Sequence, residues 1–235
     1  MNEQKPTPAV DTGMSGNLLV HSIFHTIQGE GPFAGQRAIF IRLAGCNLQC
    51  PLCDTEYTAG AQPRTVKSIV AQCERFHERT GTSLIVLTGG EPLRQNLTGL
   101  LNTLYWRNQF TVQIETNGSI AGPSEPCALQ RHTVVVSPKL SRVEPFIGHI
   151  ASAWKYVITA GEVDEQDGLP IHVLGLKGKR SVARPFGPNS GKVYVQPADS
   201  HDEEADKANM AAAVASCMDH GYTLCLQMHK YAGVE

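Results

Sequence analysis

The chain has 235 residues, of which 41% are hydrophobic and 18% are charged, and its formal net charge is −2 at pH 7. This length is enough to bury a sizeable core, in one domain or in one domain with elaborations. The small net charge, with a basic stretch only at residues 177–184 that we interpret as a solvated loop, argues against binding to nucleic acid or to an anionic membrane surface.

Residues 1–16, MNEQKPTPAVDTGMSG, are polar. They contain neither the apolar core of a secretory signal nor an Arg-rich amphipathic pattern, and no apolar run in the chain approaches the roughly 18 residues of a membrane span. We therefore expect residues 1–16 to form a disordered arm and residues 17–235 to form the folded domain. Seven cysteines without an export signal indicate a reducing compartment, and we expect the cytoplasm.

Short β-rich runs alternate with helical patterns along the chain. Strands are expected at residues 37–45, 83–92, 110–118, 133–139, 154–161, 192–199 and 222–229. Helices are expected at residues 66–79, 93–107 and 200–220. Thr65 caps the first helix and Gly81 ends it, while Ser200 and Glu203 form a capping box for the third, which ends at Gly221.

Strands that alternate with helices pair in parallel through right-handed crossovers. The pattern has too few helices for a complete eight-fold barrel, so an open, incomplete α/β barrel of about six parallel strands fits it better. Polar loops marked by Gly and Pro follow five of the expected strands. Loops at the carboxyl ends of parallel strands share one face, where such folds build their active sites.

The first of these loops carries Cys46, Cys50 and Cys53 with the spacing C-x3-C-x2-C. A structural zinc site would need a fourth ligand, and no Cys or His follows at a typical spacing. An electron-transfer ferredoxin would use four thiolates, and a chance cluster of inert thiols is a third interpretation. Three thiolates that hold a four-iron cluster, with one iron left open to a small molecule, explain why a fourth cysteine is missing. The other cysteines are interpreted as small buried residues: Cys73, Cys127, Cys217 and Cys225.

This spacing, with Gly-Gly-Glu-Pro at residues 89–92, resembles the radical S-adenosylmethionine (SAM) superfamily. The resemblance implies a modified, incomplete (β/α) barrel with a 4Fe-4S cluster, whose open iron binds the methionine end of SAM. Reductive cleavage of SAM would then give a 5′-deoxyadenosyl radical. Leu52 stands where the superfamily often has an aromatic residue that contacts adenine, so a stacking contact is weakened while iron ligation is unaffected.

The segments at residues 24–58, together with the motifs ETNG, SPK and VQPAD and the segment LQMHKYAGVE, make residues 17–235 similar to the 7-carboxy-7-deazaguanine synthase family. The resemblance implies a lyase that converts 6-carboxy-5,6,7,8-tetrahydropterin to 7-carboxy-7-deazaguanine by radical ring contraction with loss of ammonia, in queuosine biosynthesis. It also implies magnesium, a homodimer of incomplete barrels, and an electron donor of the flavodoxin or ferredoxin type.

The resemblance also implies roles for single residues, with no catalytic residue beyond the cluster and SAM. The cluster ligands are Cys46, Cys50 and Cys53, and Thr55 is the magnesium position. SAM is contacted by Leu52, Cys53, Asp54, Gly90, Ser137, Pro138, Lys139, Gln196, Pro197, Ala198 and Asp199. The pterin is contacted by Ile27, Gln28, Gly29, Arg42, Thr88, His229 and Glu235.

Three of these assignments also make chemical sense. The Arg42 guanidinium suits a bidentate pair with the substrate carboxylate, although a surface ion pair is the alternative. The Gln28 amide offers donors and an acceptor, which suits the edge of a pterin that carries both hydrogen-bond donors and acceptors. The neutral hydroxyl of Thr55 is a poor sole ligand for magnesium, so the ion should bind well only with substrate present, and a local turn beside Asp54 is the alternative.

Two other functions stay open. An activating enzyme of the same superfamily would place a glycyl radical on a partner protein, and a non-enzymatic iron-sulfur carrier would not cleave SAM at all. The constellation of Gln28, Arg42 and Thr55 favours a small substrate.

Overall fold

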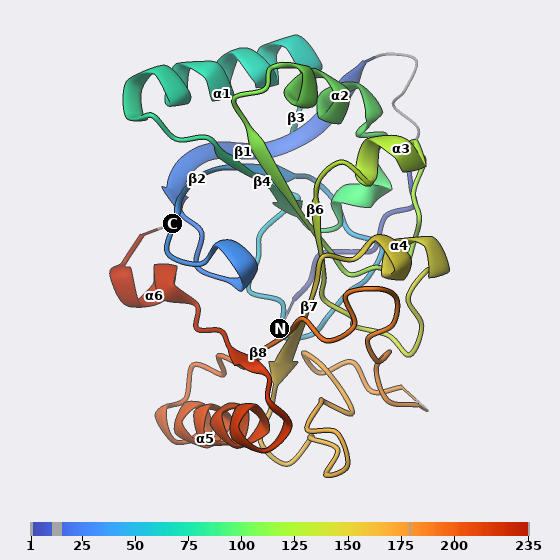
Figure 1. Cartoon of the computed structure of the whole chain (residues 1–235), viewed down its shortest axis with the longest axis vertical. Helices are drawn as coiled ribbons and strands as arrows, with labels where there is room; N and C mark the ends of the chain where they lie inside the picture. Colours follow the sequence, from blue (N-terminus) through green and yellow to red (C-terminus); the bar gives the residue numbers. More distant parts are fainter. Residues whose placement is uncertain (1, 11–15, 179, 235) are drawn as a thin grey trace.

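The computed structural model describes residues 2–10, 16–178 and 180–234. Within them, a nine-stranded sheet has the order β3-β1-β2-β4-β5-β6-β7-β8-β9 (Figure 1). The strands are β1 (Asn17–Ile27), β2 (Arg37–Leu43), β3 (Gln62–Thr65), β4 (Leu84–Gly89), β5 (Thr111–Thr116), β6 (Thr133–Val136), β7 (Ala153–Ile158), β8 (Val193–Pro197) and β9 (Thr223–Leu224). The helices are α1 (Val66–Thr80), α2 (Thr98–Trp106), α3 (Pro126–Leu129), α4 (Pro145–Ile150), α5 (Glu203–His220) and α6 (Met228–Ala232), with 3-10 turns η1 (Gly31–Phe33) and η2 (Pro92–Arg94).

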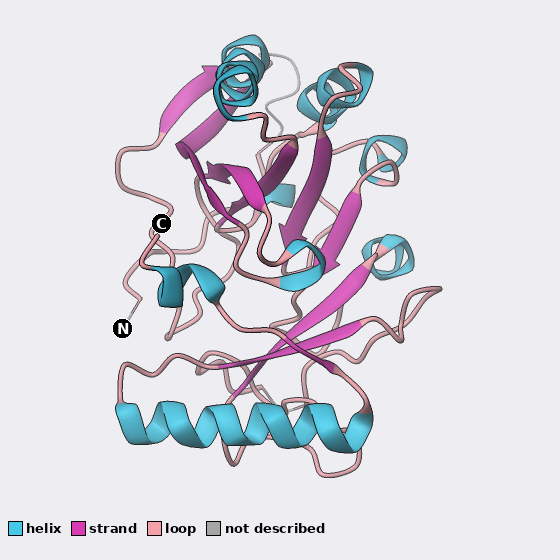
Figure 2. Cartoon of the chain, turned by 60° about the vertical axis from the view of Figure 1, so that its left-hand side comes forward, coloured by secondary structure: helices cyan, strands magenta, loops and turns pink. Residues whose placement is uncertain are grey.

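β2 pairs in parallel with β4, and parallel pairing continues from β4 through β9, whereas β1 pairs antiparallel with β2 and with β3. The sheet is curved and open (Figure 2), and β3 and β9 are its two edge strands. The prediction of an incomplete α/β barrel with few helices is confirmed. The antiparallel addition of β1 and β3 was not predicted.

The predicted start and end of α1 are confirmed. The side chain of Thr65 accepts a hydrogen bond from the Ser68 N–H at 3.1 Å, and Gly81 ends the helix with φ of 68°. This positive φ suits glycine, which lacks the Cβ that disfavours the left-handed region.

The helix predicted at residues 93–107 is wrong in its first turn. The chain forms η2, leaves helical geometry at Gln95, and enters α2 only at Thr98. Gln95 is extended because its side chain pairs with the backbone of Leu19 on β1, accepting from its N–H at 2.7 Å and donating to its carbonyl at 2.9 Å. A tertiary contact therefore overrides the local helical pattern.

The third helix ends at Gly221 as predicted, but the predicted cap is wrong. Its cap is Asp202, whose carboxylate accepts from the Ala205 N–H at 2.9 Å. The last predicted strand is shortened to β9, because the chain turns away to form α6, where the Met228 N–H donates to the Gly29 carbonyl at 3.2 Å.

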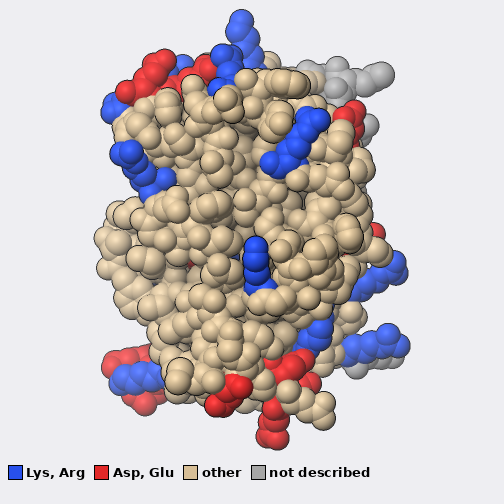
Figure 3. Space-filling view, viewed as in Figure 1, with Lys and Arg blue, Asp and Glu red and all other residues tan. Residues whose placement is uncertain are grey.

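The core lies between the sheet and the row of helices along it, and α5 packs against β8 at one end (Figure 2). The inner strands are buried along most of their length, as in β4 and β7, which is typical of parallel sheets covered on both faces. On the face shown in Figure 3, charged side chains lie mainly towards the two ends. None of the helices in the described part of the chain is both long and apolar enough to cross a membrane.

Residues 2–10 differ from our expectation of a disordered arm. They run along the cysteine loop, where the Thr7 N–H donates to the Cys46 carbonyl at 2.7 Å, and Val10 forms an isolated parallel bridge with Gln95. Residues 1 and 11–15, which belong to the same predicted arm, lie outside the described residues.

Candidate active site

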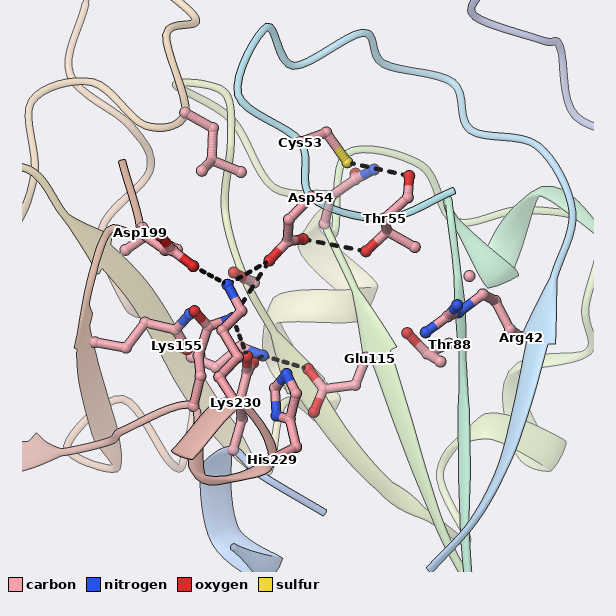
Figure 4. Close-up of a pocket in the computed structure, with 18 of the residues that line it drawn as sticks. Arg42, Cys53, Asp54, Thr55, Thr88, Glu115, Lys155, Asp199, His229 and Lys230 are labelled. Atoms are coloured by element: carbon pink, nitrogen blue, oxygen red, sulfur yellow. Dashed lines mark hydrogen bonds and ion pairs between the residues drawn. The ribbon is translucent and has the colours of Figure 1, made fainter. Parts of the chain in front are cut away.

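A cavity of about 480 Å³ opens where the parallel strands end (Figure 4). The predicted residues that line it are Ile27, Gln28, Arg42, Leu52, Cys53, Asp54, Thr55, Thr88, Gly90, Ser137, Lys139, Gln196, Pro197, Asp199 and His229. The predicted residues that adjoin the lining in sequence or in the cysteine loop are Gly29, Cys46, Cys50, Pro138 and Ala198. Glu235 lies outside the described residues. The structure brings the predicted residues together, and the role of each stays a prediction.

The three cysteines lie on the loop after β2, which packs closely on the Gly-Gly-Glu-Pro turn after β4. A Cβ atom added at Gly90 would come within 2.4 Å of the Gly45 carbonyl oxygen and 2.7 Å of the Cys46 Cβ. Gly89 has φ of 140°, and a Cβ there would come within 2.0 Å of the Leu43 carbonyl oxygen. The two glycines are therefore needed for this close approach, which joins two motifs that lie far apart in sequence.

Burial raises the pKa of all three thiols, and that of Cys46 reaches about 12. These thiols must lose protons to bind iron, so cluster binding would release protons and leave buried thiolates paired with metal. Lys139 lies near Cys50 and Cys53 and its positive charge favours their ionised forms. In the described part of the chain, no three His, Cys, Asp or Glu side chains are grouped tightly enough for a single metal ion. A cluster does not need such a group, because each thiolate binds a different iron.

Glu91 of the Gly-Gly-Glu-Pro motif is fully buried and ties two of the loops together. Its carboxylate accepts from the Leu93 N–H at 2.9 Å, the Thr116 hydroxyl at 2.8 Å and the Asn117 N–H at 2.7 Å. Burial raises the pKa of Glu91 to about 7, although these bonds favour the ionised form. Its role is to hold the loop after β4 against the loop after β5.

The other side of the cavity carries a charge cluster that the sequence did not predict. The Lys155 ammonium on β7 pairs with Glu30 and lies 3.0 Å from the Glu115 carboxylate on β5. The Gln227 amide donates to Glu30 at 2.9 Å. Burial opposes charge on Glu30, but Lys155 outweighs it and lowers the pKa of Glu30 to about 2. The two carboxylates also raise the pKa of Lys155 against the effect of burial, so Lys155 and Glu30 are ionised at neutral pH.

Arg42 lies on the opposite wall, on β2 beside Thr88 of β4 (Figure 4). The register of these strands pairs the two residues directly. The Arg42 guanidinium carbon lies 5.1 Å above the centre of the Phe24 ring, and Phe24 stacks on Phe40 with ring centres 5.3 Å apart. This cation–π contact orients the guanidinium beside the cavity.

The segment α6 covers part of the cavity. A Cβ added at Gly29 would come within 2.1 Å of the His229 Nδ1 atom, so Gly29 leaves the space that His229 fills. Lys230 donates to Asp199 at 2.6 Å and to Asp54 at 3.3 Å, and Asp54 in turn accepts from the Thr55 hydroxyl at 3.2 Å. Burial lowers the pKa of His229, which favours its neutral form.

Several lining residues were missed by reasoning from the sequence. Glu30 and Glu115 lie inside the motifs QGEG and ETNG, so their place beside Gln28 and after a strand was a usable signal. Lys155 sits in the strand sequence AWKYVI, where a lone lysine among apolar residues was the signal for a buried, paired charge. Lys230 carried no signal beyond its position after His229.

A profile described as the radical SAM superfamily matches residues 40–137. A 7-carboxy-7-deazaguanine synthase from Rhodospirillum rubrum is 39% identical over 97% of this chain and 97% of its own length. One from Rickettsia prowazekii is 34% identical over 98% of this chain and 94% of its own length. Among solved structures, the crystal structure of QueE from Escherichia coli matches with a TM-score of 0.65 and 24% identity, over 89% of this chain and 93% of that one. The structural match shows the shared fold.

Proposed function

The chain belongs to the 7-carboxy-7-deazaguanine synthase family of the radical SAM superfamily, and we propose that its cavity carries out the synthase reaction. The reaction is the radical ring contraction of 6-carboxy-5,6,7,8-tetrahydropterin to 7-carboxy-7-deazaguanine with loss of ammonia. The observation that supports this most is that one cavity has two chemically different sides. The cysteine loop lies on one side, and the Lys155 charge cluster and Arg42 lie around the space for a small polar molecule.

The residues on the cysteine side fit a cluster and SAM. Cys46, Cys50 and Cys53 would hold the cluster, and Gly90, which lines the cavity next to the Cys46 loop, would meet the methionine end of SAM. When bound, the cluster and SAM supply the radical that abstracts hydrogen from the substrate. Ser137 and Lys139 on one flank, and the segment at residues 196–199 on the other, would hold the rest of SAM.

The residues of the Lys155 charge cluster, together with Arg42 across the cavity from it (Figure 4), would bind and orient the pterin. Arg42 supplies a fixed positive charge for the substrate carboxylate. Glu30 and Glu115, held by Lys155, offer acceptors to pterin N–H groups, and the Gln28 amide offers both donors and an acceptor. Because these groups are already paired and oriented by the protein, little reorganisation accompanies binding.

Magnesium would bind beside Thr55, where the Asp54 carboxylate already contacts the Thr55 hydroxyl. Substrate oxygens and water would complete the ligand set of this hard cation. From membership of the family we further propose a cytoplasmic homodimer that receives electrons from a flavodoxin- or ferredoxin-type protein.

The test is an anaerobic assay of cluster-reconstituted protein with SAM, reductant, magnesium and 6-carboxytetrahydropterin, in which mass spectrometry follows deazaguanine product and 5′-deoxyadenosine. Product in excess of the SAM consumed supports the proposal and shows that SAM is regenerated. Release of 5′-deoxyadenosine without deazaguanine would contradict the assigned substrate, and would favour an activating enzyme that acts on a partner protein.

A further inference from the structure

We propose that residues 2–10 form a strap that positions the three-cysteine loop and slows its opening. That the loop holds a cluster rests on the proposed function. The hydrogen bonds between the strap and the loop do not depend on it. We refer to residues 2–10 as the N-terminal strap.

One contact of the strap lies at the beginning of the cysteine loop. The Thr7 N–H donates to the Cys46 carbonyl at 2.7 Å, and the Thr7 hydroxyl donates to the same oxygen at 3.2 Å. The Thr7 carbonyl accepts from the Arg94 guanidinium at 3.1 Å, and that guanidinium also donates to the Ala44 carbonyl at 3.3 Å. Thr7 is thus bonded both to the first predicted cluster ligand and to the η2 turn that supports the loop.

A second contact is made by Asn2, in the middle of the loop. The Asn2 N–H donates to the Pro51 carbonyl at 2.9 Å, and its side-chain amide donates to the Cys50 carbonyl at 3.2 Å. The Asn2 side-chain oxygen also accepts from the Gln4 N–H at 3.0 Å, which fixes the local geometry of the strap.

A third contact is made by Gln4, at the end of the loop. The Gln4 amide nitrogen donates to the Thr55 carbonyl at 2.8 Å, and its oxygen accepts from the Tyr57 N–H at 2.9 Å. One side chain therefore satisfies backbone groups on both sides of Glu56. Backbone groups in an irregular loop need such partners, because no strand or helix supplies them.

The sequence of the strap suits this role. Asn2, Gln4, Thr7 and Val10 are partly buried, whereas the residues between them are exposed. The prolines at residues 6 and 8 lack N–H groups and restrict the backbone towards extended conformations. Thr7 therefore supplies the backbone N–H donor of this Pro-Thr-Pro stretch. Because the prolines already restrict the unbound strap, it loses less conformational entropy on docking than a chain without prolines would.

Two of the three predicted ligand side chains are buried in the loop to which the strap is bonded. Cys46 and Cys50 are each only 8% exposed. Opening of the loop would have to break the bonds to Thr7, Asn2 and Gln4. The strap should therefore slow the loss of a bound cluster and the access of reagents to the free thiols.

The experiment compares full-length protein with a Gln4→Met variant and with a deletion of residues 2–10. Alkylation of each cysteine in the cluster-free protein is followed by peptide mass spectrometry, and cluster loss from reconstituted protein in air is followed by visible absorbance. We expect Cys46 and Cys50 in the Gln4→Met variant to react about tenfold faster, which corresponds to about 1.4 kcal/mol in loop opening. The deletion should have a larger effect, and cluster loss should accelerate in the same order.

Two controls separate the strap from general destabilisation. Lys5→Met changes an exposed residue of the strap and should leave both rates unchanged. Cys73, which is fully buried in the main core, should react at the same slow rate in every variant. Unchanged reactivity of Cys46 and Cys50 in the Gln4→Met variant would overturn the proposal, even if the deletion variant fails to fold. Faster alkylation in a protein that makes no deazaguanine would support the strap and contradict only the proposed function.

Discussion

The two sides of the cavity are held in place by different forces. On the cysteine side, backbone hydrogen bonds and close glycine contacts fix the loop, and burial raises the pKa of the Cys46 thiol, which stays neutral without a metal. On the other side, Lys155 holds Glu30 and Glu115 by direct charge pairing. The first side gains its charged ligands only when a metal displaces the thiol protons, whereas the second is charged and oriented before any ligand arrives.

This difference indicates that only the cysteine side depends on the loading of a metal cluster. The cysteine side should be sensitive to cluster loading and oxidation, and the charged side to the removal of any one member of its network. A buried charge that loses its partner costs more than the intact pair contributes, so single substitutions there should have large effects.

The largest effect is expected on the cysteine side. Cys46→Ser replaces a predicted thiolate ligand by a hydroxyl, so the cluster should be lost and product formation should fall by more than about 10⁴-fold. Iron content and deazaguanine formation measure the two losses. Cys127→Ser is the matched control and should keep both, because Cys127, which we expected from the sequence to be buried, is exposed in the structure. Stoichiometric iron and normal turnover in Cys46→Ser would contradict the assignment.

The second effect concerns the charged side. Lys155→Met leaves Glu30 and Glu115 buried without their cation, so we expect kcat/KM to fall roughly 10²- to 10³-fold, corresponding to about 3–4 kcal/mol. Burial then raises the pKa of Glu30, and activity of the variant should recover partly as the pH rises. Lys67→Met, at an exposed lysine on α1, should behave as wild type.

The same pair predicts a pH dependence of stability. The pKa of Glu30 is about 2 in the folded protein, below the ordinary Glu value of about 4.3. A carboxyl with a lowered folded pKa contributes stability that is fully present above its unfolded pKa and is lost as the pH falls through the folded value. Urea unfolding between about pH 5 and pH 2 should therefore show a steeper loss of stability in wild type than in Lys155→Met.

A smaller effect is expected where α6 covers the cavity. Gly29→Ala would place a methyl group 2.1 Å from the His229 Nδ1 position, so the imidazole must move. We expect KM for the pterin to rise on the order of tenfold with a smaller change in kcat. Gly99→Ala is the control, because a Cβ there meets only the Val66 Cγ2 atom at 3.7 Å and favours the helix. An unchanged KM in Gly29→Ala would remove His229 from the substrate site.

Much of the fold could be predicted because its signals are local. The apolar run of β4 ends in two glycines, and α1 begins at a capping threonine and ends at a glycine. In contrast, β1 was missed because polar residues such as His21 and Ser22 interrupt its pattern, which is typical of a half-buried strand near a sheet edge.

Site residues that belong to a sequence motif could be predicted. Site residues whose place depends on a partner far away in the sequence could not. The resemblance assigned Cys46 and Arg42 from their motifs. Lys155 and Glu30 are 125 positions apart, so no local pattern could show that they pair. The N-terminal strap was predicted to be disordered because its composition is polar, yet it is held by backbone and amide hydrogen bonds that need no apolar residues.

The smallest effect is expected at Lys230, on the helix α6 that covers part of the cavity. It contacts Asp54 of the cysteine loop and Asp199 after β8, while the neighbouring His229 lines the cavity near Glu30. All three paired side chains are partly exposed, so each ion pair should contribute at most about 1 kcal/mol. Lys230→Met should therefore lower kcat/KM by about three- to tenfold, and Lys230→Arg should lose less.

Lys207→Met on α5 is the matched control, because Lys207 also pairs with two carboxylates, Glu203 and Glu204, but on the outer surface. If Lys230 acts only as a surface ion pair, the two methionine variants will have equal activity, and salt will have the same small effect on both. If Lys230 couples the two sides, SAM will strengthen pterin binding equally in wild type and in the Lys207→Met variant. The gain in pterin affinity will be smaller in Lys230→Met. Calorimetry of reconstituted protein measures this gain. A coupling that survives in Lys230→Met would show that the two sides communicate through the bound ligands alone.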